Sequence, residues 1–220
     1  MFPFRDRTEA GRMLAETLRE YANREDVVVL ALPRGGAPVG FEVAKALNAP
    51  LDVFVVRKLG LPGQEELAMG AIASGGARVL NREIIHALGI PDDVVEQVTQ
   101  EEQRELERRE REYRDGRPPI DVRGRKVILV DDGLATGSSM RVAVLALRQK
   151  QPAQIVVAVP VAPRDSCVEL EFVADRVVCA FTPEPFWGVG QWYADFSQTS
   201  DEEVRDLLRR AAGLPAHRAA

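Results

Sequence analysis

Short apolar runs alternate with longer amphipathic segments along most of the chain. Apolar runs bounded by polar residues, Gly or Pro are typical of strands that are buried on both faces of a sheet. Such runs occupy residues 26–32, 49–56, 127–130, 154–161 and 175–180. Segments with helical spacing of apolar residues lie at 5–22, 37–47, 141–150, 163–173 and 199–212. This alternation predicts an α/β fold, in which helices flank a mainly parallel, twisted sheet with right-handed crossovers.

The strand predicted at residues 127–130 leads into a turn that carries unusual chemistry. Asp131 and Asp132 follow it directly, and the sequence continues Gly-Leu-Ala-Thr-Gly-Ser-Ser over residues 133–139, with Thr136 or Ser138 as the expected helix cap. Ligands of open parallel sheets bind beyond the carboxyl ends of strands, and a helix N-terminus favours a phosphate. Two carboxylates suit vicinal hydroxyls or hydrated Mg²⁺ rather than a bare phosphate. The turn is therefore expected to bind ribose 5-phosphate, the alternative being an ordinary buried strand with a polar turn.

Four hydrophobic residues, two acids, a short linker and Thr-Gly followed by hydroxyl residues resemble the phosphoribosyl-pyrophosphate (PRPP) loop of the type I phosphoribosyltransferases. The version found here, Asp-Asp-Gly-Leu-Ala-Thr-Gly-Ser-Ser-Met, is most similar to the loop of the adenine enzymes. The resemblance implies that Asp131 and Asp132 are catalytic and bind the ribose hydroxyls, directly or through Mg²⁺. It also implies a set of residues that binds the 5-phosphate of PRPP: Ala135, Thr136, Gly137, Ser138 and Ser139.

A second candidate anion site follows the strand predicted at residues 26–32. The sequence there is Pro33-Arg34-Gly35-Gly36. The glycines allow backbone N–H groups to point inward, and Arg34 can make a forked, charge-assisted contact. The position and order match the pyrophosphate loop of the same family. The alternative is a plain strand-to-helix turn that the glycines only tighten.

Residues 59–70 are rich in Gly and Pro, which predicts a mobile loop. The segment resembles the flexible catalytic loop of the family, which would close over the reaction and exclude water. Arg57 and Lys58, just before it, are expected to bind the departing pyrophosphate. Glu65 or Glu66 is expected to protonate a ring nitrogen, although a Glu pair in a loop is more often simply solvated.

Two further regions are assigned by comparison with compact members of that family. Residues 75–122 look like an insertion, and their charged run at 91–115 predicts a long, largely solvated helix, with dimerisation or loop shielding as the alternative role. Residues 1–180 would form the core, and residues 181–220 a C-terminal hood with a final helix. Six of the 13 aromatic residues lie at 181–196. The candidates for stacking on an acceptor base are Phe186, Trp187 and Trp192, whereas most of these rings are expected to plug the sheet edge.

Composition and charge limit the classes of molecule that the protein is expected to bind. A net charge of −5 gives no basic surface for nucleic acid, and no apolar run approaches the ~20 residues of a membrane span. Cys167 and Cys179 lie in apolar surroundings outside any CxxC pattern, so they are expected to be buried, reduced thiols. A cytoplasmic protein with small-molecule substrates is predicted, and a homodimer is the expected assembly.

Taken with the resemblance, these features predict an Mg²⁺-dependent phosphoribosyltransferase that moves ribose 5-phosphate from PRPP to a nitrogenous acceptor. Ala135 stands where the 6-oxopurine enzymes carry an acid, which argues against hypoxanthine and guanine. Adenine, orotate and acceptors outside the usual nucleobases stay open. The main alternative is a non-enzymatic, nucleotide-sensing regulator of the same fold. A hydrolase is a third possibility, against which the water-excluding loop argues.

Overall fold

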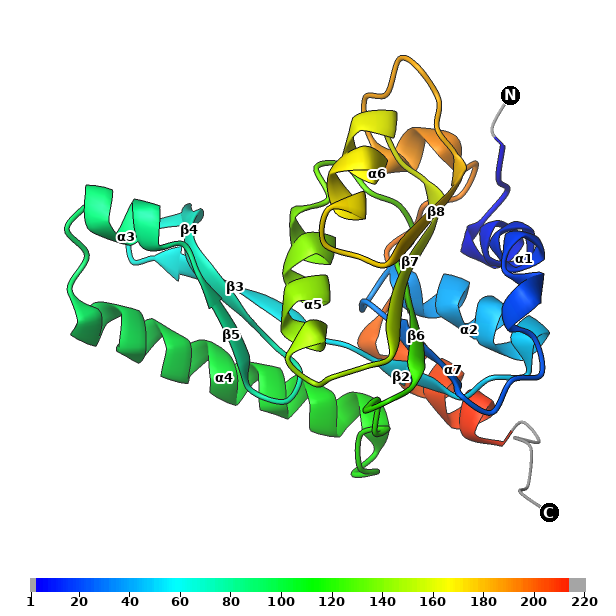
Figure 1. Ribbon diagram of the computed structural model, residues 1–220, viewed down its shortest axis with the longest axis horizontal. Coiled ribbons are helices and arrows are strands. Elements are labelled where there is room, and N and C mark those ends of the chain that lie inside the picture. Colours follow the sequence, from blue (N-terminus) through cyan, green and yellow to red (C-terminus); the bar gives the residue numbers. More distant parts are fainter. Residues whose placement is uncertain (1–2, 214–220) are drawn as a thin grey trace.

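The protein contains one parallel and one antiparallel sheet, as seen in a computed structural model that describes residues 3–213 apart from the side chains of residues 65 and 66 (Figure 1). The parallel sheet has the order β2-β1-β6-β7-β8. Its strands are β1 (Val27–Ala31), β2 (Leu51–Val53), β6 (Lys126–Val130), β7 (Gln154–Val161) and β8 (Arg176–Phe181). All four neighbouring pairs run parallel, which confirms the predicted fold class.

Helices cover both faces of this sheet, and alternate residues of each strand pack against them. Val27, Val29 and Ile128 face one helical layer, whereas Val28 and Leu129 face the other. The first layer contains α1 (Arg7–Thr17), α2 (Gly36–Leu47) and α7 (Asp201–Ala212), and the second contains α5 (Ser138–Arg148) and α6 (Arg164–Glu171). Burial on both faces explains why the strands read as continuous apolar runs. Across residues 3–213, no helix has the length and apolar character needed to cross a membrane.

The antiparallel sheet corrects the prediction of a mobile loop at residues 59–70. β3 (Val56–Leu61) and β4 (Gln64–Ala73) form a hairpin, and β5 (Ala77–Leu80) adds a third strand. Leu61 pairs with Gln64, so Pro62 and Gly63 make a two-residue turn, where Gly63 has a φ of +81°. The Gly and Pro residues therefore mark a tight turn and an irregular register near Gly60.

The hairpin projects from the core, and the long helix α4 (Asp92–Arg114) runs beside it, with the short helix α3 (Arg82–Ala87) between them in the chain (Figure 1). About half of the residues of α4 are exposed, and Leu106 and Tyr113 are buried in the main core. Its last residue, Arg114, is also buried and pairs with Asp52 of β2 at 2.8 Å. α4 is thus anchored to the parallel sheet rather than only solvated.

Two local predictions were wrong. Neither Thr136 nor Ser138 caps α5: Gly137 occupies the N-cap, with a φ of +69° that favours glycine, and no side chain caps the helix. Cys167 of α6 and Cys179 of β8 form a disulfide instead of two reduced thiols. The fold places α6 against β8, with these Cα atoms 6.7 Å apart, a proximity that sequence spacing does not reveal.

The segment predicted to form the hood contacts residues near the start of the chain. The short 3-10 helix Val189–Trp192 leads to Tyr193, which forms an isolated parallel bridge with Phe4. Phe4, Val161 and Tyr193 form a small buried cluster, against which Trp192 packs. The boundary at residue 180 stays a prediction.

Candidate active site

Adjacent strands bring the two predicted anion-binding turns together. β1 and β6 are neighbours, with Ala31 beside Val130, so the turn after each strand lies at the same edge of the sheet. A Cβ atom added to Gly35 would lie 2.1 Å from Asp132 Oδ2, and one added to Gly36 would lie 2.8 Å from the Val130 carbonyl oxygen. Both glycines are therefore needed for space where the turn at residues 33–36 packs against the acids.

Asp132 is held by residues from both ends of the chain. Arg7 Nε donates to Asp132 Oδ2 at 2.8 Å, and the two side chains are 11% and 14% exposed. The Arg7 guanidinium lies 4.0 Å from the ring centroid of Phe196, and it donates to the Ser197 carbonyl oxygen at 2.6 Å. Tyr193 donates its hydroxyl proton to the Asp132 carbonyl oxygen at 2.5 Å. Sequence reasoning missed Arg7 and Tyr193, because neither belongs to a motif near the acids.

Burial determines the charge of the acid pair. Desolvation, and then the neighbouring Asp132, raise the pKa of Asp131 well above its ordinary value. Burial also raises the pKa of Asp132, although Arg7 opposes that shift. The pair therefore holds a proton more tightly than two exposed carboxylates would. A cation or hydroxyl donors at this position would favour the ionised form.

The turn at residues 133–139 forms an open cradle whose rear is fixed to the core. Leu134 N donates to the Val161 carbonyl oxygen at 3.0 Å, and Ser166 Oγ donates to the Ala135 carbonyl oxygen at 2.8 Å. Thr136 and Ser138 share a hydrogen bond of 2.9 Å between their hydroxyls, and the side chains of residues 135, 136, 138 and 139 are at least partly exposed. No side chain caps α5 from the N-cap position, and Ser138 N makes only a long hydrogen bond of 3.5 Å to Thr136 Oγ1, so the other N–H groups of the first turn are available to an anion.

The structure does not bring Arg57 and Lys58 to one ligand. Arg57 pairs with Glu102 of α4, with a shortest N–O distance of 2.5 Å. Successive residues of a strand face opposite sides, so Lys58 lies on the other face of the hairpin, where it is exposed. The backbone of Glu65 and Glu66 belongs to β4, and their side chains lie outside the described part of the chain.

The predicted acceptor residues differ in their surroundings. Trp192 packs edge-on against Phe181, at 5.3 Å between ring centroids, and stacks on Phe186 at 6.3 Å. Its Nε1 is buried and has no hydrogen-bond partner within residues 3–213. Trp187, by contrast, is 78% exposed. Trp192 and Phe186 thus pack against each other, and Trp187 faces solvent.

A parallel sheet with paired acids beyond β6 and an uncapped helix N-terminus beside them is the arrangement of a phosphoribosyl transferase. The chain belongs to this family: the model of the phosphoribosyl transferase domain matches residues 6–193.

Individual relatives agree with that assignment. The chain is 47% identical over 208 residues to the Mycobacterium tuberculosis proteins Rv0571c (strain H37Rv) and MT0597 (strain CDC 1551), whose names give phosphoribosyl transferase as a provisional assignment. The match covers 94% of this chain and 47% of each relative, so the chain spans about half their length. The crystal structure of TT1426 from Thermus thermophilus is similar, with a TM-score of 0.81 and 42% identity over 94% of this chain and 98% of that one.

Proposed function

We propose that the protein transfers ribose 5-phosphate from PRPP to a nitrogen atom of an acceptor and releases pyrophosphate. The observation that carries this proposal is the contact between the turn at residues 33–36 and the Asp131–Asp132 pair, beside the start of α5. In this proposal the turn at residues 33–36 binds the 1-pyrophosphate of PRPP, the acid pair binds the ribose hydroxyls, and the start of α5 binds the 5-phosphate.

Each part of PRPP has its own partners in this proposal. Asp131 and Asp132 accept hydrogen bonds from the ribose hydroxyls. Arg7 Nε donates to Asp132 Oδ2 and so holds this carboxylate in place, and Asp132 Oδ1 is our candidate acceptor for a ribose hydroxyl. The 5-phosphate binds the N–H groups and hydroxyls of residues 135–139. Arg34, Gly35, Gly36 and Lys58 bind the pyrophosphate, and Arg57 joins them only if it leaves Glu102.

The two carboxylates fit a role in Mg²⁺ binding, since this ion typically takes one or two carboxylates together with water and substrate phosphates. Within residues 3–213, no cluster of three or more His, Cys, Asp or Glu side chains is arranged to hold a metal by itself. We therefore infer that Asp131 and Asp132 hold Mg²⁺ through water or the ribose, and that the ion neutralises charge on the pyrophosphate.

The protein contributes mainly position and charge. The acceptor nitrogen attacks the anomeric carbon as the bond to pyrophosphate breaks, with the oxocarbenium character typical of glycosyl transfer. The cradle at residues 135–139 and the acid pair align the ribose, while Arg34 and Lys58 stabilise the departing charge. Glu65 or Glu66 on the hairpin remains our candidate for proton transfer with the acceptor ring.

The acceptor would lie under the hood. Trp187 is our first choice for stacking on a planar acceptor, because Phe186 and Trp192 already pack against each other. Ala135 in place of an acid disfavours 6-oxopurines, and adenine and orotate are the first acceptors to test.

An assay of pyrophosphate release tests this function. The protein is incubated with PRPP, Mg²⁺ and one acceptor at a time: adenine, orotate, hypoxanthine, guanine or none. We expect pyrophosphate and an N-ribosylated product in equal amounts with an accepted base, and none with hypoxanthine or guanine. Release without any acceptor would indicate a hydrolase. If the protein binds PRPP but releases no pyrophosphate with any acceptor of a wide panel, the result would favour a non-enzymatic, nucleotide-sensing regulator.

A further inference from the structure

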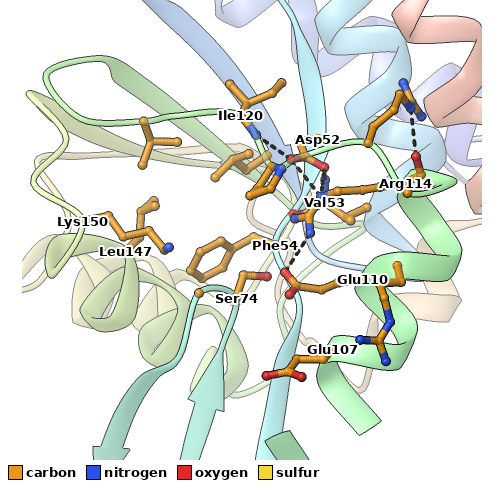
Figure 2. A pocket seen from close by; sticks show the side chains of 17 residues that line it. Asp52, Val53, Phe54, Ser74, Glu107, Glu110, Arg114, Ile120, Leu147 and Lys150 are labelled. Carbon is orange, nitrogen blue, oxygen red and sulfur yellow. Dashed lines mark hydrogen bonds and ion pairs between the residues drawn. The ribbon is translucent and has the colours of Figure 1, made fainter. Parts of the chain in front are cut away.

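A cavity of about 300 Å³ lies at the base of the β3–β4 hairpin, between α4 and the end of α5 (Figure 2). Leu147 and Lys150 line it near the C-terminal end of α5, whereas the phosphate cradle lies at the N-terminus of the same helix. An α-helix of 11 residues spans about 16 Å, so the two sites are separate. The volume is at the lower end of that of small-molecule pockets.

One wall of the cavity is apolar and includes an aromatic ring. Phe54 lies beside Leu147, and Figure 2 shows Lys150 reaching toward this ring from the α5 side. The apolar lining includes Leu30, Val53, Phe54, Ile120, Val122 and Leu147. A ligand here would bury an apolar or aromatic body.

The buried acid in the cavity is already compensated. The Asp52 carboxylate accepts from Arg114 Nε at 2.8 Å and from the backbone N–H of Ile120 at 3.1 Å. Arg114 also pairs with Glu110, at 3.1 Å. This network needs no ligand and forms a fixed, polar floor.

Three donors in the cavity remain uncommitted within the described residues. Neither Lys150 nor Arg111 has an ion-pair partner among residues 3–213, and Lys150 is half-buried. Ser74 is 4% exposed; its Oγ accepts from Val55 N at 2.7 Å, and its own proton has no acceptor in the described part of the chain. Glu107, the remaining acid, accepts from the Gln103 amide at 2.8 Å. Ser74 is the buried member of this set, Lys150 is half-buried and Arg111 is exposed, so an anion that entered the cavity would meet donors that no acceptor of the described residues occupies.

We propose that this cavity binds a small organic anion with an apolar or aromatic body. Its anionic group, a carboxylate, sulfonate or phosphate, takes the Lys150 ammonium and the Ser74 hydroxyl, with Arg111 at the entrance. Its body packs on Phe54 and Leu147. This site does not depend on PRPP chemistry at the other end of α5.

Occupation of the cavity would stiffen the hairpin at its base. Ser74 N donates to the Val55 carbonyl oxygen at 2.8 Å, and Phe54 N donates to the Ala31 carbonyl oxygen at 2.9 Å. The ligand would contact Phe54, which precedes β3, and Ser74, which follows β4, at the point where the hairpin joins the parallel sheet. If the hairpin carries Lys58 to the pyrophosphate, as proposed above, the cavity is an effector site.

Fluorescence titration with 8-anilinonaphthalene-1-sulfonate, an aromatic anion, tests the proposal. We expect one saturable site on the native protein, weakened about tenfold or more in Lys150→Gln, since a charge-assisted hydrogen bond is lost. Lys150→Arg should restore binding. Arg104→Gln, which removes the same charge from an exposed position of α4 outside the cavity, should leave it unchanged.

Two further measurements separate this site from the others. Saturating PRPP with Mg²⁺ should not displace the probe, and bound probe should slow amide hydrogen exchange at Val55 and Ser74. Equal affinity in Lys150→Gln and the native protein would overturn the proposal, as would displacement by PRPP. Either result would leave the proposed transferase function untouched.

Discussion

Replacing Arg114 with Met tests how α4 is held against the core. The Arg114 and Asp52 side chains are each 8% exposed, and Arg114 Nε lies 2.8 Å from Asp52 Oδ1. Arg114 also donates to the Val53 carbonyl oxygen at 3.0 Å. Methionine retains most of the apolar stem but leaves the Asp52 carboxylate buried with backbone donors alone.

The expected cost follows from that burial. Removing one partner of a buried ion pair costs about 3–5 kcal/mol, because an uncompensated charge remains. In a domain of this size, each kcal/mol lowers the melting temperature by about 2–4 °C. We therefore expect Arg114→Met to melt about 6–20 °C below the native protein when thermal unfolding is followed by circular dichroism.

Arg209→Met provides the matched control. Arg209 also pairs with an acid, Asp115, at 2.9 Å, but these side chains are 65% and 41% exposed. Such a pair contributes about 0–1 kcal/mol. The double variant Asp52→Asn with Arg114→Met should recover part of the loss, since no buried charge is then left alone. Equal melting temperatures for Arg114→Met and Arg209→Met would refute the reasoning.

Three other predictions concern the disulfide and the acid pair. Cys179→Ser should lower the free energy of unfolding, measured in urea, by about 3 kcal/mol, which is the chain-entropy value for a sequence separation of 12. The stability of this variant should not change when a reductant is added. Two titratable thiols in the unreduced native protein would contradict the prediction. Gly35→Ala should weaken PRPP binding, measured by calorimetry, at least about tenfold, because the added methyl group displaces the Asp132 carboxylate. Gly188→Ala is the control, since a Cβ atom there lies in open space. Equal PRPP affinities of the two variants would be inconsistent with the proposed PRPP site. Asp131→Asn should raise the melting temperature at pH 7. The folded state raises the pKa of Asp131 above its ordinary 3.8, so the native protein loses stability as the pH rises from that value through the raised pKa. Below about pH 4, where Asp131 is protonated in both states, the gain in melting temperature should vanish. A melting temperature at pH 7 below that of the native protein would show that Asp131 is stabilising when ionised.

The parts of the fold that sequence predicts are those determined by local pattern. A strand buried on both faces must be apolar throughout, so the runs at β1, β6 and β7 were identified almost to the residue. The final helix, predicted at residues 199–212, also forms, and Ser200 caps it by accepting from the N–H of Glu203.

The features that the sequence does not predict depend on contacts between residues far apart in the chain. Glycines that predict a mobile loop also suit a tight turn, so the sequence pattern of residues 59–70 does not distinguish a loop from the hairpin that forms. Arg7 reaches Asp132 across 125 residues, and nothing near either position indicates the contact. Arg114 sits in a charged run that predicts a solvated helix, and only the packing against β2 explains its burial.

Calorimetric titration of the protein with PRPP, with and without Mg²⁺, tests the central proposal most directly. Asp132→Asn removes the charge that we propose faces the ribose, and Asp92→Asn, on the exposed first turn of α4, serves as the control. We predict Mg²⁺-dependent binding that is lost in Asp132→Asn and kept in Asp92→Asn, with Asp132→Asn still folded by circular dichroism. Binding of equal affinity in Asp132→Asn, or no binding by the native protein in either condition, would contradict the assignment of this pocket to PRPP.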